Sequence, residues 1–214
     1  MDVVWLGGMV SRLAVVVALT AAAAFSQTAH QAVQTGMDLF VRGDIDGSIR
    51  EFERAAQAEP AVVPELWQRG ISYYYAGRFE DGRKQFEIHR TVNPNDVENA
   101  AWWYLCMVKL GRREQARKQL LPVGPDARIP MAEIYDLYAG RGSEAKVMEA
   151  VEKGEDSGQP RRVRLFYAHL YLALLADVHG DAKAAAKHIK ISLDQNTGGY
   201  MRAVAVVHQK AMKK

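Results

Sequence analysis

The stretch GRFEDGRKQFEIHRTVNPND, residues 77–96, decides the fold, because its glycine, phenylalanine and proline recur 34 residues earlier in the chain. A shift of that length brings Gly70, Gly77, Phe86 and Pro94 onto Gly36, Gly43, Phe52 and Pro60. Self-similarity at a fixed period indicates a repeat architecture, in which each unit buries its apolar face against the next one.

Each residue type in the repeat suits one place in a helical hairpin. Gly36 and Gly70 lie inside the first helix, where glycine costs about 1 kcal/mol relative to alanine, so we expect the second helix to pack closely there. Gly43 and Gly77 stand where a left-handed cap would end that helix. Proline stops the second helix, and Pro64 is expected as the first residue of the next one.

Weaker copies of the hairpin continue along the chain, and no strand pattern competes with them. We therefore expect one all-α domain over residues 27–214, a solenoid whose last apolar face is covered by a terminal helix. The expected units are clear repeats over 29–62 and 63–96, an altered repeat over 97–128, degenerate hairpins over 129–158 and 160–195, and a cap over 199–214.

The N-terminus has the three parts of a secretory signal peptide. Arg12 supplies the positive charge, residues 13–24 form an apolar run, and Ala24 and Ser26 provide small residues for cleavage. The run is shorter than the ~20 residues that span a bilayer, so we expect a membrane anchor only if the signal stays uncleaved. The sequence predicts a signal peptide over residues 1–26, with Met9 as an alternative start, and a periplasmic or secreted protein.

Composition argues against several classes of function. The 28 Lys and Arg residues barely exceed the 25 Asp and Glu residues, and the two signs alternate, so nucleic acid is not an expected partner. The histidines lack metalloprotease spacing, no GxSxG turn is present, and Cys106 is a lone cysteine in apolar surroundings. We expect no catalytic residue, metal or cofactor, although a hydrolase with an unrecognised site and a structural homo-oligomer stay open as alternatives.

The 34-residue pattern resembles the tetratricopeptide repeat (TPR) family, in which a small residue, an aromatic residue and a proline hold these offsets. The match covers about residues 29–95. The resemblance implies a right-handed solenoid of about four or five stacked antiparallel hairpins plus a capping helix. The exported array carries the segments ELWQRGISYYYAGR, residues 65–78, and FYAHLYLALLADVHGD, residues 166–181. With these segments the chain is also similar to bacterial envelope adaptors of the NlpI type, which implies a scaffold for other proteins.

The TPR resemblance further implies a concave groove lined by the first helix of each hairpin. The positions that would line it are Val33, Met37, Phe40, Trp67, Ile71, Tyr74, Ala101, Leu105 and Val108. Because these residues are apolar, we expect the groove to hold a partner peptide or amphipathic helix. The alternative is that the chain's own C-terminal helices fill it. The expected function is a non-catalytic protein-binding adaptor.

Overall fold

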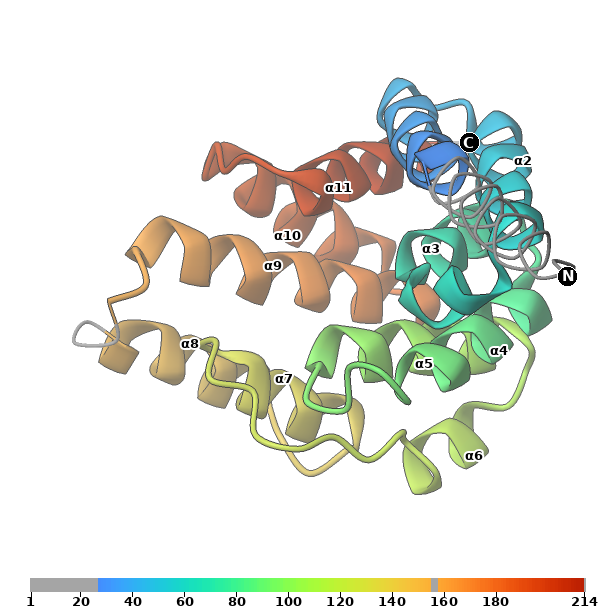
Figure 1. Ribbon diagram of the computed structural model, residues 1–214. Helices are drawn as coiled ribbons and strands as arrows, with labels where there is room; N and C mark the ends of the chain where they lie inside the picture. The colour runs from blue at the N-terminus through green and yellow to red at the C-terminus, as the bar shows by residue number, and fades with distance from the viewer. Residues whose placement is uncertain (1–26, 155–157, 214) are drawn as a thin grey trace, which may run out of the picture.

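The computed structural model describes residues 27–154 and 158–213, and every regular element in this part of the chain is a helix (Figure 1). The first helix covers residues 27–42. The elements after it are α2 (Ile45–Ala58), the 3-10 helix η1 (Pro60–Glu65), α3 (Trp67–Tyr75), α4 (Phe79–His89), α5 (Val97–Lys109), α6 (Arg113–Lys118), α7 (Met131–Tyr138), α8 (Glu144–Lys153), α9 (Arg161–Val178), α10 (Ala182–Asp194) and α11 (Tyr200–Ala211). The all-α expectation is confirmed.

The turns between paired helices are made by glycines in the left-handed region, as the sequence predicts. Gly43 ends the first helix with φ +88°, and Gly77 stands between α3 and α4 with φ +74°. An L side chain is strained in this conformation, whereas glycine adopts it readily. The hairpin turns thus follow directly from local residue choice.

The two glycines inside the helices lie against the repeated phenylalanines. A Cβ atom on Gly36 would stand 3.1 Å from the Phe52 ring, and one on Gly70 would stand 2.7 Å from the Phe86 ring. Both rings are almost fully buried. The predicted close approach of the second helix is therefore confirmed in both clear repeats.

The prolines act less uniformly than the sequence suggests. Pro60 follows the end of α2, as expected, but it also begins η1. Pro64 lies inside this 3-10 helix and does not open the next α-helix, which begins at Trp67. The expectation for Pro64 was therefore wrong, because the connecting segment forms helical turns of its own. In the third expected unit, the second helix, α6, is short and ends at Lys118.

Consecutive helices pack on each other in pairs, α3 with α4, α7 with α8 and α9 with α10. Helix α4 also packs on α5, which joins one pair to the next. All side chains over residues 100–107 of α5 are buried, so this helix lies at the centre of the main core. Cys106 belongs to this run, and burial raises the pKa of its thiol far above the ordinary value.

The last helix lies against the first helix of the described chain. Helix α11 packs on α10 and reaches the helix over residues 27–42 (Figure 1). The ring of Tyr200 stacks on Phe40 at a centroid distance of 5.2 Å and meets the edge of Trp67 at 5.4 Å. The C-terminal helix therefore covers apolar side chains from the first two hairpins.

The predicted signal peptide, residues 1–26, lies outside the described residues. Within residues 27–154 and 158–213, no helix combines the length and apolar character needed to cross a membrane.

Candidate functional site

The nine residues expected in the groove occupy two kinds of environment. Five of them belong to the core: Phe40, Ile71, Tyr74, Ala101 and Leu105. The other four, Val33, Met37, Trp67 and Val108, are partly exposed. The nine positions therefore do not form one open apolar groove, because five of them are buried.

Two sets of contacts explain this burial. Tyr200 of α11 covers Phe40, as the alternative of coverage by the C-terminal helices anticipates. Tyr74 packs edge-to-face on Phe79 and on Trp102, at centroid distances of 5.6 and 5.4 Å. Apolar rings that find neighbours within the chain are more stable there than in water.

Trp67, at the start of α3, differs from the other eight because it lines two neighbouring hollows. The outer one is an open recess of about 480 Å³. Its wall includes Trp67, Asp96, Glu98, Asp126 and Arg128, and we call it the acidic recess. The inner one, of about 40 Å³, is more enclosed, and it shares Trp67, Asp96 and Glu98 with the recess. We call it the inner cavity.

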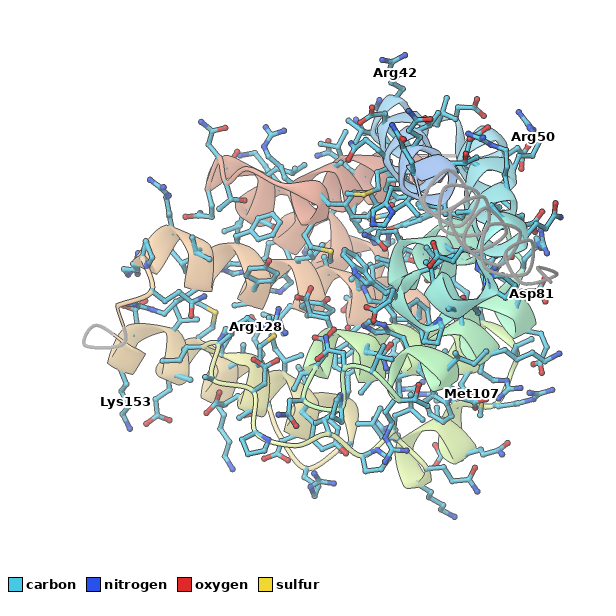
Figure 2. The ribbon with its side chains drawn as sticks, in the orientation of Figure 1. Arg42, Arg50, Asp81, Met107, Arg128 and Lys153 are labelled. Atoms are coloured by element: carbon cyan, nitrogen blue, oxygen red, sulfur yellow. The ribbon has the colours of Figure 1, made fainter. Side chains whose placement is uncertain are left out.

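Two elements far apart in sequence supply the charged groups of the acidic recess. Asp96 is the N-cap of α5, where its side chain accepts a hydrogen bond from the amide of Glu98 at 3.1 Å. Acidic residues are favoured at such helix starts by the unpaired amides and the helix dipole. Asp126 and Arg128 come from the loop between α6 and α7, and Arg128 lies near the middle of the face seen in Figure 2.

Arg128 holds three carboxylates together. Its Nη2 lies 2.7 Å from Asp96 Oδ1 and 2.6 Å from Asp126 Oδ2, and its Nη1 donates to Glu98 Oε1. Burial has the largest single effect on Asp126 and would raise its pKa, but the hydrogen bonds and the charge of Arg128, together with the hydrogen bond from the Val97 amide, lower it overall. This arrangement fixes the three acidic side chains around one guanidinium.

Of the two carboxylates that line the inner cavity, Glu98 is less exposed than Asp96. Its side chain is 13% exposed, and Oε2 accepts a hydrogen bond of 2.5 Å from the hydroxyl of Tyr171 on α9. Burial raises the pKa of Glu98, and the charge of Arg128 opposes this shift. Tyr167 lies on α9, the helix of Tyr171, and burial together with the charge of Glu98 raises the pKa of Tyr167 to about 12.

Two residues of the inner cavity carry polar atoms without partners. Asn99, which is only 3% exposed, donates from Nδ2 to the carbonyl of Phe86 at 2.9 Å, but its Oδ1 has no hydrogen-bond partner among the described residues. The same holds for Nε1 of Trp102. Buried polar atoms are nearly always hydrogen-bonded in folded proteins, so unpartnered ones beside a cavity indicate a place for a ligand or for water.

Three of the histidines, His89, His169 and His188, are buried between helices. His89 is buried and lies 2.7 Å from the carbonyl of Pro64. His169 and His188 pair within the α9 and α10 hairpin, with their Nδ1 atoms 2.8 Å apart. Over the described part of the chain, no three His, Cys, Asp or Glu side chains are grouped to hold a metal ion.

Sequence reasoning found Trp67 but missed the other members of the site. The pair Asp96 and Glu98 could have been noticed as two acidic residues at the start of an apolar helix. Asp126 and Arg128 gave no comparable signal, because they lie in an irregular loop about 30 residues further on. No model of a known protein family matches the chain.

Proposed function

We propose that this protein is a non-catalytic adaptor that binds a partner polypeptide at Trp67 and the acidic recess. The helices would form a right-handed, TPR-like solenoid. The equivalent packing of Gly36 on Phe52 and of Gly70 on Phe86 supports this arrangement, since the two contacts repeat at the same spacing. The signal-like sequence of residues 1–26 supports a place in the cell envelope or outside the cell.

The observation that carries the proposal is the position of Trp67. It is a partly exposed aromatic residue at the junction of an open recess and a narrower cavity. Tryptophan beside a desolvated pocket is typical of the few residues that dominate binding energy at protein interfaces. The recess is also polar enough to orient a bound chain, because charged groups fix register and specificity.

The state of the carboxylates favours binding over catalysis. A general base needs a free carboxylate or imidazole within reach of a substrate proton. Asp96, Glu98 and Asp126 instead all pair with Arg128, and the hydroxyl of Tyr171 further restrains Glu98. Such a cluster presents fixed charge to a ligand.

A displayed library of random peptides, panned against the full-length protein, tests the proposal. Enriched peptides are then measured by fluorescence polarisation against wild type, Trp67→Leu and Ile88→Ala. Ile88 is a suitable control because it is an exposed apolar residue on α4 that lines neither the recess nor the inner cavity. Circular dichroism checks that each variant is folded.

We expect peptide affinity to fall about tenfold or more in Trp67→Leu, the loss of an interface hot spot, and to be unchanged in Ile88→Ala. Peptides that bind both variants like wild type would place the binding surface elsewhere. Failure to enrich any peptide would count against the adaptor function itself.

A further inference from the structure

The acidic recess carries more negative than positive charge. Asp96, Glu98 and Asp126 contribute three carboxylates, whereas Arg128 is the single basic side chain among the described residues that line the recess and the inner cavity. The side chains of Glu98 and Asp126 are only 13% and 5% exposed. Because sheltered charges are poorly compensated by water, a cation brought by a ligand would be strongly attracted here.

Hydrogen-bond acceptors in the two hollows remain available for such a cation. Among the described residues, both hydrogen bonds that Asp96 accepts end on Oδ1, which leaves Oδ2. Each oxygen of Glu98 accepts one hydrogen bond, and a carboxylate oxygen has room for a second. Asn99 Oδ1 accepts none from the described residues. A primary ammonium group, with three donors and no acceptor, matches such a set.

The shape and the apolar walls of the inner cavity select among cations. Trp67, Phe86 and Trp102 line it, and a cation near an aromatic face gains about 0.5–2 kcal/mol. The inner cavity offers about 40 Å³, and a water-sized group needs about 10–15 Å³ of a cavity. An ammonium group therefore fits, whereas a planar guanidinium with three nitrogens is bulkier. The indole N–H of Trp102 is a donor and takes no part in holding the cation.

We propose that the acidic recess receives a lysine side chain of the partner polypeptide, with its aliphatic stem along Trp67 and its ammonium group in the inner cavity beside Glu98 and Asn99. This inference rests on the proposed adaptor function, since the partner supplies the lysine. It names the chemistry that the partner must present.

The ammonium site can be tested without any peptide. The probe is n-butylammonium, which reproduces the end of a lysine side chain, and n-pentanol is its neutral counterpart. The indole N–H signals of the full-length ¹⁵N-labelled protein report binding by NMR, because Trp67 and Trp102 both line the inner cavity. Single Trp→Phe variants assign the signals.

We expect n-butylammonium to shift these two signals in a saturable way and n-pentanol to leave them in place. Glu98→Gln should weaken the binding about tenfold, as expected for the loss of a charged hydrogen bond. Glu149→Gln, an exposed carboxylate on α8 that pairs with Lys153, is the matched control and should not change it. If Glu98→Gln does not fold, Asp96→Asn replaces it, since asparagine is also a good N-cap.

Two outcomes of the n-butylammonium experiment overturn the inference. One is the absence of a saturable shift with n-butylammonium, and the other is an equal shift with n-pentanol. An equally strong response to n-propylguanidinium would overturn the selection of lysine over arginine.

Peptides separate this inference from the adaptor function. A selected peptide is compared with the same peptide carrying norleucine in place of each lysine. A loss of about tenfold supports lysine recognition, whereas equal binding overturns it and leaves the adaptor function standing. Amine binding without any peptide ligand would support the ammonium site and overturn the adaptor function.

Discussion

Replacing Arg128 with methionine should destabilise the protein at neutral pH, and the loss of stability should become smaller as the pH falls. Methionine keeps most of the length of the side chain but removes the guanidinium. Asp96, Glu98 and Asp126 then lose their shared cation, and their charges repel one another across the recess. Asp126 retains hydrogen bonds from two backbone amides, those of Val97 at 3.3 Å and of residue 128 at 3.1 Å.

The size of the effect follows from the burial of the partners. Removing one member of a buried ion pair costs about 3–5 kcal/mol, whereas an exposed pair contributes about 0–1 kcal/mol. The carboxylates are sheltered, but the side chain of Arg128 is 38% exposed, which screens its charge. We therefore expect a loss of about 2 kcal/mol in the free energy of unfolding at pH 7.

The pH dependence has a definite sign. In wild type, Arg128 lowers the pKa of Asp126, so this carboxylate stabilises the fold above its ordinary pKa and loses that contribution as pH falls through the lowered value. Burial already raises the pKa of Glu98 in wild type. Without Arg128, burial and mutual repulsion raise the pKa values of Glu98 and Asp126 in the folded state above their wild-type values. Protonation of these carboxylates then stabilises the folded variant. The difference in the free energy of unfolding between wild type and Arg128→Met therefore shrinks as pH falls from 7 towards 4.

Urea unfolding followed by circular dichroism at pH 7.0, 6.0 and 5.0 measures this difference. Arg141→Met is the matched control, because Arg141 is 61% exposed and its one ion pair among the described residues is with Asp136 at 2.8 Å. Its guanidinium also lies 5.7 Å from the ring centroid of Tyr135. It should cost less than about 1 kcal/mol, with no pH-dependent change. Equal stability of Arg128→Met and wild type at pH 7, or a difference that does not vary with pH, would refute the reasoning.

Three further predictions concern the packing of the helices, and thermal or urea unfolding measures all of them. Gly70→Ala should destabilise the protein by about 1–2 kcal/mol, because the new Cβ would stand 2.7 Å from the buried Phe86 ring. Gly36→Ala, whose Cβ would stand 3.1 Å from the Phe52 ring, should stay within about 0.5 kcal/mol of wild type. Equal losses of stability in the two variants would contradict this prediction. Tyr200→Ala should cost about 2–4 kcal/mol, since its ring stacks on Phe40, and Tyr200→Phe should restore most of the loss. Burial and the neighbouring imidazole lower the pKa of His169 to about 4, so stability should fall as pH drops from about 6.5 to 4, and His169→Gln should flatten that slope.

The sequence by itself determined the local parts of the fold. Gly43 and Gly77 end helices because their backbone conformation is one that other residues rarely adopt. Gly70 faces Phe86 because helical spacing and a repeated hairpin bring these two residues to one contact. Rules of this kind act within one repeat, so a single sequence with a 34-residue period is enough to reveal them.

The tertiary structure decided which surfaces remained open. Phe40 and Tyr74 had the pattern of groove residues, but α11 covers the first and neighbouring aromatic rings cover the second. Arg128 lies in the loop between α6 and α7, and because this loop has no sequence periodicity, the position of Arg128 in the site could not be predicted. Burial of apolar area and pairing of charges depend on which distant segments meet, and the order of residues along the chain does not state that choice.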